Sequence, residues 1–256
     1  MAPDIDHYIV VDAPDMPQFK TLADPHTMIV DSRELIDPEL HKLWGQNGWW
    51  LGRRVPPLRG WITQQLRKLA MPQICSSDAF INVDSDVAFI RPFSPSIIFS
   101  GERLALFEVD YRNRESIGWS NDAAAMLGIE APEQPNNYVG MLICWWNSVT
   151  RDLTAQIERH TGLPWQIALG KKRSFSEYII YGTFVRHRVG LEAARHFPDD
   201  RPLVQLSWGA DMRDPRALRN LFDTLHDSAI AVMVHSKDGV STDAYEGLVR
   251  QQWKFG

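Results

Sequence analysis

Cysteine is scarce in this sequence, which has Cys75 and Cys144 and no other. Because the two lie far apart, they form neither a CxxC metal motif nor a disulfide framework, and we expect a reducing, cytoplasmic location. No stretch approaches the roughly 18 consecutive apolar residues of a transmembrane helix. The N-terminus carries Asp4 and Asp6 where a signal peptide carries Lys or Arg, so we expect neither a signal peptide nor a transmembrane segment.

An excess of basic residues is also absent. The 27 Lys and Arg are outnumbered by 32 Asp and Glu, and the formal net charge is -5. This balance argues against a nucleic-acid partner, and any phosphate site must be local. The chain does contain 10 Trp, which suits a globular protein that binds sugars or bases by stacking.

Strand-like and helix-like segments alternate along the chain. Short apolar runs predict strands at 7–11, 27–30, 79–83, 103–109, 138–146, 203–206 and 229–234. Helical spacing predicts helices at about 59–70, from 147 to Gly162, at 214–226 and at 243–253. We therefore expect a single α/β domain with a mostly parallel central sheet flanked by helices, and an irregular insertion at 116–137.

The most informative segment is AFINVDSDVAFIRPF, residues 79–93. In an extended segment residues i and i+2 project to the same side, so Asp84 and Asp86 present two carboxylates together while Ser85 points away. Mg²⁺ and Mn²⁺ bind such oxygen ligands and complete their shell with water and substrate phosphates. Because the apolar run places the pair at the carboxyl end of a central strand, we expect a divalent-metal site; a solvated turn is the alternative.

Residues 60–93, GWITQQLRKLAMPQICSSDAFINVDSDVAFIRPF, resemble the DxD region of GT-A fold glycosyltransferases. They are most similar to a group of bacterial glycosyltransferases with a W-x-x-QQ helix, here Trp61, Gln64 and Gln65. Further similar segments are YVGMLICWW at 138–146, FSEYIIYGTF at 175–184 and VMVHS at 232–236.

The resemblance implies a GT-A-like (Rossmann-like) domain that transfers a sugar from a nucleotide-sugar donor. The donor would be a UDP-sugar or a related compound, held through Mn²⁺ or Mg²⁺, and the acceptor a hydroxyl of a glycan or another molecule. Residues 1–110 would form the half that binds nucleotide and metal, and residues 111–256 the acceptor side.

The metal and the donor phosphates require further side chains. The resemblance implies that His235, directly after a late strand, is a third metal ligand; a hydrogen-bonded structural histidine is the alternative. Contacts to the nucleotide or its phosphates are expected from Asp12, Asp15, Gln65, Lys68, Ser85 and Lys237. Turn formation and solvated helix or loop faces explain these positions equally well.

Glycosyl transfer also needs a carboxylate, either to take the acceptor proton or to stabilise an oxocarbenium-like centre. Glu177 is the main candidate because it lies at a predicted helix start in the family-like S-E-Y segment. Its alternative role is a favourable interaction with the helix dipole. Glu108 and Asp110, at the end of the strand LALFEV, are the substitutes. Aromatic side chains for the sugar or acceptor pocket would come from Tyr178, Tyr181 and Trp145, although Trp145 also suits core packing.

Other interpretations stay open. The strand at 7–11 resembles the second strand of the usual GT-A series, so a chain that lacks the first strand-helix unit is one possibility. A transferase fold without turnover would be a non-catalytic domain that binds carbohydrate or nucleotide-sugar. Asp84-Ser85-Asp86-Val87 also fits the nucleophile motif of haloacid-dehalogenase-like phosphatases, with Asp199 and Asp200 as the late acidic pair. Donor sugar, acceptor and stereochemistry are set by pocket shape and have no motif here.

Overall fold

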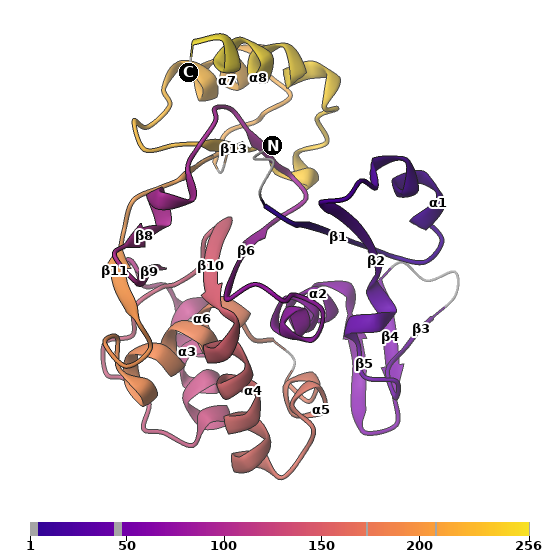
Figure 1. Ribbon diagram of the computed structural model, residues 1–256, viewed down its shortest axis with the longest axis vertical. Coiled ribbons are helices and arrows are strands. Elements are labelled where there is room, and N and C mark those ends of the chain that lie inside the picture. The colour runs from indigo at the N-terminus through magenta and orange to yellow at the C-terminus, as the bar shows by residue number, and fades with distance from the viewer. Residues whose placement is uncertain (1–4, 44–47, 173, 208, 256) are drawn as a thin grey trace. The chain divides into compact units, whose positions relative to one another are not determined.

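Helices and strands alternate in the computed structural model, which describes residues 5–43, 48–172, 174–207 and 209–255 (Figure 1). The chain is mixed α/β, as expected. The expected continuous, mostly parallel central sheet is not what the described strands form: they pair in five sheets of two or three strands, some parallel and some antiparallel. One reason is that no described strand exceeds five residues, and turns divide the apolar runs between sheets.

The residues divide into two compact units, each assembled from three separate stretches. Unit 1 comprises 1–78, 111–135 and 146–190, and unit 2 comprises 79–110, 136–145 and 191–256. The sequence-based boundary between residues 110 and 111 is one of the five positions at which the chain passes from one unit to the other. In the described part of the chain, no helix has the length and apolar character needed to cross a bilayer.

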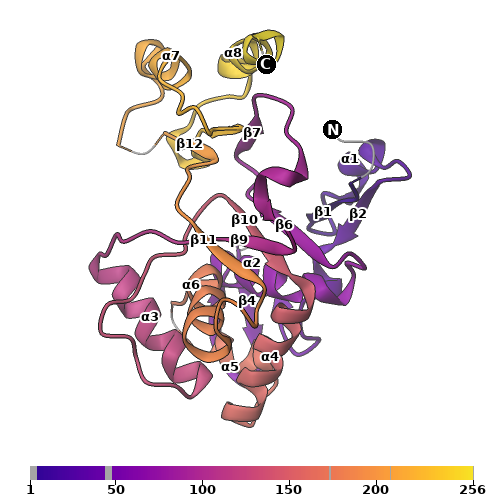
Figure 2. The same ribbon diagram turned by 60° about the vertical axis from the view of Figure 1, so that its left-hand side comes forward.

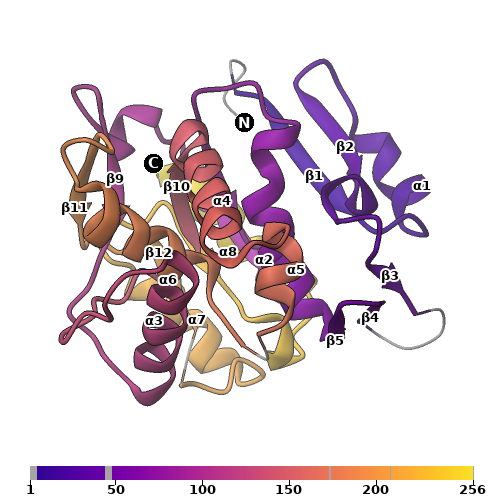
Figure 3. The same cartoon turned by 90° about the horizontal axis from the view of Figure 1, so that it is seen from below.

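Unit 1 contains two small sheets and most of the helices. The strands β1 (His7–Val11) and β2 (Thr27–Asp31) pair in parallel, and Figure 3 shows them beside the short helix α1 (Met16–Phe19). An antiparallel sheet has the order β3 (His41–Lys42), β4 (Trp49–Gly52) and β5 (Val55–Arg59). Pro56 and Pro57 lie in β5, which tolerates them because it is an edge strand of this sheet.

The helices of unit 1 follow these strands. They are α2 (Gly60–Ala70), α3 (Arg114–Leu127), α4 (Asn147–Thr161), α5 (Trp165–Gly170) and α6 (Glu177–Thr183), which continues into the π-helix η5 (Phe184–Val189). Short 3-10 turns are η1 (Lys20–Leu22), η2 (Ser32–Leu35) and η3 (Met71–Gln73). Both α2 and α3 pack against α6, and the contact of α2 with α6 joins segments more than a hundred residues apart.

The expected irregular insertion at 116–137 is wrong over its first half, which belongs to α3. Asn113 and Ser116 form a reciprocal capping box at the start of this helix, and Gly128 ends it with a φ of 68°. The two cap residues satisfy backbone N–H groups that the first helical turn leaves without partners. The buried side of α3 consists of small residues such as Ala123 and Ala124, so the sequence shows little of the hydrophobic periodicity that predicts a helix.

Unit 2 contains the other sheets. The strand β6 (Ala79–Val83) pairs with β10 (Leu142–Trp146), and β9 (Arg103–Phe107) lies between β11 (His196–Asp199), which is parallel to it, and β8 (Phe99–Ser100), which is antiparallel. The third sheet has the order β12 (Val204–Leu206), β13 (Ala231–Met233) and β7 (Val87–Phe89). The remaining elements are η4 (Pro95–Ile98), α7 (Pro215–Asp223), η6 (Ser236–Asp238) and α8 (Asp243–Phe255).

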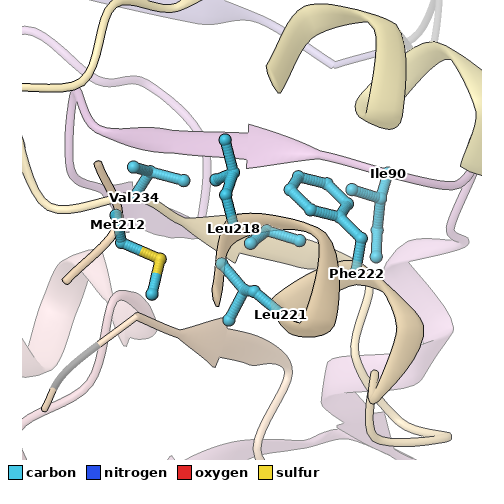
Figure 4. Close-up of a cluster of buried hydrophobic side chains, with 7 residues drawn as sticks. Ile90, Met212, Leu218, Leu221, Phe222 and Val234 are labelled. Carbon is cyan, nitrogen blue, oxygen red and sulfur yellow. The ribbon is translucent and has the colours of Figure 1, made fainter. Parts of the chain in front are cut away.

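A cluster of buried hydrophobic residues packs α7 against this third sheet. Ile90 follows β7 and Val234 follows β13, and both are buried against Leu218, Leu221 and Phe222 of α7. Figure 4 shows Phe222 beside Ile90, and Figure 2 shows α7 and α8 at the end of unit 2 that carries β12 and β7. The cluster therefore packs against the two strands, β7 and β13, that adjoin the DxD segment and the loop of His235.

Candidate functional site

Three loops meet at one edge of the β12-β13-β7 sheet. β12 and β13 are parallel, so the loops that follow Leu206 and Met233 leave the sheet at the same edge. β13 and β7 are antiparallel, with Met233 opposite Val87, so the segment that precedes Val87 reaches this edge as well. The pairing thus gathers the DxD segment and the loop after β13, although they are far apart in sequence.

The DxD segment forms a tight turn between β6 and β7. The backbone N–H of Val87 donates to the carbonyl of Asp84 at 3.2 Å, which closes a turn over residues 84–87. Asp84 and Asp86 are half-buried while Ser85 is exposed. The Oδ2 atom of Asp86 accepts a hydrogen bond from the backbone N–H of Ser236 at 3.1 Å. One of the two carboxylates predicted to bind the metal therefore forms a hydrogen bond with the loop that carries His235.

The loop after β13 is held by its own polar contacts. The backbone N–H of His235 donates to Ser207 Oγ at 3.2 Å, and Ser207 Oγ donates to Asp238 Oδ2 at 3.0 Å. His235 Nδ1 accepts from the backbone N–H of Lys237 at 3.0 Å. The side chain of Lys237 is exposed.

Asp86 also affects Tyr245 of α8. Burial raises the pKa of Tyr245, and the negative charge of Asp86 raises it further. A cation beside Asp86 would reduce this second effect.

Carboxylates such as those of Asp84 and Asp86 are ligands that a hard divalent cation prefers, whereas the His235 imidazole as placed directs its Nδ1 lone pair to the backbone of Lys237. A carboxylate has about four lone-pair positions, so the single bond from Ser236 leaves Asp86 able to bind an ion. His235 accepts at Nδ1, so a neutral ring carries its proton on Nε2 and has no lone pair there to offer a metal. Among the residues that the structure describes, no three His, Cys, Asp or Glu side chains are grouped to hold a metal ion. A metal ion at this edge of the sheet would therefore be held by Asp84 and Asp86, without His235.

Several of the other predicted residues gather in unit 1, where α2 meets α6. Lys68 Nζ lies 3.0 Å from Glu177 Oε1 and donates to the Tyr178 hydroxyl at 2.6 Å. The Lys68 and Glu177 side chains are only 13% and 5% exposed. Gln65 Oε1 accepts from the backbone N–H of Glu177 at 3.0 Å. Glu177, predicted as the catalytic carboxylate, is thus a buried ion-pair partner in this arrangement.

Asp12, at the end of β1, lies in a second charged cluster of unit 1. Its carboxylate accepts from Ser32 Oγ at 2.7 Å and forms ion pairs with Lys42 and Arg67. Burial raises the pKa of Asp12, but the hydrogen bonds from Lys42 and Ser32 and the charge of Arg67 outweigh burial and lower it. Asp15 is exposed, directly before α1, and its side chain makes no capping hydrogen bond.

The three aromatic residues predicted for a sugar pocket, Trp145, Tyr178 and Tyr181, are all buried. Trp145 is buried and packs edge to face on Phe80, with ring centroids 5.9 Å apart. Tyr181 is buried as well, and its hydroxyl accepts from the backbone N–H of Trp146 at 3.0 Å. Large aromatic side chains are favoured in the interior of a protein, and this explains why these residues are buried in a strand and a helix.

The substitute carboxylates follow β9 in unit 2. Glu108 Oε1 accepts from Asn136 Nδ2 at 2.7 Å, while Asp110 is exposed. The late acidic pair of the phosphatase alternative is at the end of β11, where both carboxylate oxygens of Asp199 accept from Arg201. That bidentate ion pair uses Asp199 to hold a neighbouring side chain.

Sequence reasoning missed residues that build these sites through long-range contacts. Ser207 bridges two loops, Ser236 contributes a backbone N–H, and Arg67 lies 5.3 Å above the Trp50 ring. The only available signal for Ser207 was its place directly after an apolar strand. The backbone N–H of Ser236 could not be predicted from the sequence, because a backbone donor does not depend on the type of residue.

A family model matches residues 1–236, and the chain belongs to that family, described as a family of unknown function (DUF6492). The match includes the DxD turn and His235. No curated protein matches the chain.

Proposed function

We propose that this protein is a metal-dependent glycosyltransferase that moves a sugar from a nucleotide-diphosphate sugar, a UDP-sugar by preference, to an acceptor hydroxyl. The observation that supports it best is the hydrogen bond between Asp86 and Ser236, which joins the DxD turn to the loop of His235. The proposal includes a GT-A-like domain and action in a reducing compartment such as the cytoplasm. Its finer parts come from the resemblance of residues 60–93 to GT-A enzymes.

The residues at the sheet edge would bind the metal, bind a phosphate and order the loop. Asp84 and Asp86 would hold Mn²⁺ or Mg²⁺, which when bound neutralises negative charge on the leaving nucleoside diphosphate. Lys237 is exposed on the same loop and would approach a phosphate as a point charge. His235 would keep the loop in place through its bond with the backbone of Lys237.

The group that takes the acceptor proton must be reachable and able to change its charge. Asp110 meets the first requirement because it is exposed, three residues after the end of β9, and Glu108 lies two residues before it. Glu177 would need its ion pair with Lys68 to open first. We therefore rank Asp110 first among the candidates for the base.

The test is a thermal-shift screen of UDP-sugars and other nucleotide sugars, with Mn²⁺ and with EDTA. A donor at about 100 times its Kd should raise the Tm by roughly 5–10 °C, and only when Mn²⁺ is present. Asp86→Asn should abolish the shift, whereas Asp211→Asn, which changes an exposed carboxylate of unit 2 paired with Arg213, should keep it. A shift that does not need Mn²⁺ and survives in Asp86→Asn would contradict the proposal.

Product analysis separates the three classes of protein. Mn²⁺-dependent release of UDP from the donor supports a transferase. Donor binding without any release indicates a non-catalytic binding domain. Hydrolysis of p-nitrophenyl phosphate that is lost in Asp84→Asn indicates a phosphatase.

A further inference from the structure

Two tryptophans of unit 1 form an aromatic pair that the sites above do not use. Trp61, in the first turn of α2, and Trp119, in α3, have ring centroids 5.9 Å apart and planes inclined by 36°. Trp61 is 45% exposed and Trp119 is half-buried. A large apolar ring left in water lowers stability relative to a buried one, so an exposed tryptophan beside a second one suggests a binding surface.

The orientation of Trp119 is fixed by a polar contact. Its indole Nε1 donates to Ser174 Oγ at 2.7 Å. Ser174 lies shortly before α6, the helix against which both α2 and α3 pack. The aromatic surface is therefore supported from three segments of unit 1.

Amide groups lie on the same side of α2 as Trp61. Gln64 and Gln65 follow Trp61 by three and four residues, spacings that place side chains next to each other on a helix. Gln64 is exposed and offers both a donor and an acceptor. Gln65 is 2% exposed, and among the described residues its buried Nε2 has no hydrogen-bond partner. Because the Gln65 amide accepts from the backbone N–H of Glu177 in the interior, Gln64 is the amide of this pair that a ligand at the surface can reach.

Two ion pairs lie on the elements that carry the aromatic pair. Lys68, one turn beyond Gln65, is paired with Glu177, and Lys172 Nζ lies 2.7 Å from Asp122 Oδ1 on α3. Charges that are paired in this way attract an anion such as a nucleotide weakly. It suits a neutral molecule with an apolar face and a hydroxyl rim, and this is the chemistry of a pyranose ring.

We propose that Trp61, Trp119 and Gln64 form a binding face for a neutral glycan. The C–H faces of the sugar rings stack on the indoles, and ring hydroxyls bond to the Gln64 amide. The inference deepens the proposed function by naming the acceptor class, and it rests on that function only for the glycan's role as acceptor. Binding itself requires neither donor nor metal.

Calorimetric titration of the whole chain tests this in EDTA and without nucleotide. The probes are hexasaccharides from β-1,4-glucan, α-1,4-glucan, mannan and chitin. The wild type should bind at least one of them. Trp61→Ala and Trp119→Ala should each raise the Kd about tenfold, while Trp61→Phe, which keeps a ring, should raise it less. Trp253→Ala is the matched control, because Trp253 is 42% exposed on α8 of unit 2, and it should leave the Kd unchanged.

Three results would overturn the inference. They are no binding of any of the four probes at millimolar concentration, an equal Kd in Trp61→Ala and wild type, and binding of UMP at this face in place of sugar. Asp86→Ala separates the inference from the proposed function, because it should keep glycan binding while losing Mn²⁺-dependent donor binding. A wild-type protein that binds a donor in the presence of Mn²⁺ but binds none of the four glycans refutes this inference alone.

Discussion

The carboxylate of Asp86 accepts a hydrogen bond at 3.1 Å from the backbone N–H of Ser236, a residue 150 positions later in the chain. The antiparallel pairing of Val87 with Met233 sets up this contact, because each of these residues lies close to one of the partners. The carboxylate thus has two separable properties: it accepts from the late loop, and it carries negative charge. Substitutions can remove one property without the other.

Asp86→Asn keeps an oxygen that accepts from Ser236 but removes the charge. We expect its free energy of unfolding to stay within about 0.5 kcal/mol of wild type, while Mn²⁺ affinity falls at least about tenfold. Asp86→Ala removes both properties and should also lose about 1 kcal/mol of stability. Urea unfolding and Mn²⁺ titration followed by electron paramagnetic resonance measure the two effects. Unchanged Mn²⁺ affinity in Asp86→Asn would remove Asp86 from the metal site.

His235 can be tested in the same way, because an Asn side chain places an acceptor oxygen close to the position of Nδ1. His235→Asn should keep the hydrogen bond from Lys237 and the 3-10 turn η6, whereas His235→Ala should lose them and about 1 kcal/mol of stability. If the ring only orders the loop, Mn²⁺ affinity in His235→Asn will match wild type. A fall of tenfold or more in both variants would instead show that the ring turns to bind the metal.

The buried pair of Lys68 and Glu177 should be strongly coupled. Lys68→Met leaves the Glu177 carboxylate buried without its cation, and Glu177→Gln leaves the Lys68 ammonium without its anion, so each should destabilise the protein by about 3 kcal/mol. The double variant should be more stable than the sum of the two losses predicts, by more than about 1 kcal/mol. Urea unfolding of the four proteins measures this coupling. Additive losses would mean that the two side chains do not interact.

Local signals in the sequence predicted many elements well. β1 and β6 have the predicted bounds because both are apolar runs that end at an aspartate. α4 ends at Gly162, whose φ of 67° is the left-handed conformation that glycine adopts readily. Asp214 caps α7 as expected, with its side chain accepting from the backbone N–H of Arg216. In each case the deciding interaction lies within a few residues.

Pairing between distant segments was not predictable in the same way. The apolar runs at 79–83 and 87–90 are separated by three polar residues, and nothing in either run shows that β6 and β7 join two different sheets. Many strand orders are compatible with such short apolar runs, because the pattern shows which face is buried and not which strand lies alongside.

The candidate sites show the same division between local and distant information. Placing Asp86 and His235 at strand ends followed from apolar runs. The ion pair of Lys68 with Glu177 depends on how α2 packs against α6, and residue types alone do not specify this packing. Hence the sequence suggested separate roles for residues that in fact contact each other.

His196 should make stability depend on pH in a defined window. This histidine is fully buried in β11, and its Nδ1 lies 3.0 Å from the carbonyl oxygen of Leu104. Burial lowers its pKa from 6.5 to about 4; the hydrogen bond to Leu104 opposes this shift, and the charge of Arg195 adds to it. Because the unfolded chain takes up the proton first, the contribution to stability is complete above pH 6.5 and is lost as the pH falls toward 4.

Between pH 7 and pH 5 this loss should amount to about 2 kcal/mol, as one pKa unit corresponds to about 1.4 kcal/mol. His196→Leu should be less stable than wild type at pH 7, because the Leu104 carbonyl loses a partner, but that deficit does not depend on pH. The measurement is urea unfolding of both proteins at pH 7 and pH 5. Wild type should lose about 2 kcal/mol more than the variant over this range, since the carboxylates titrate alike in both. Equal losses would mean that His196 takes up a proton in the folded protein as readily as in the unfolded chain.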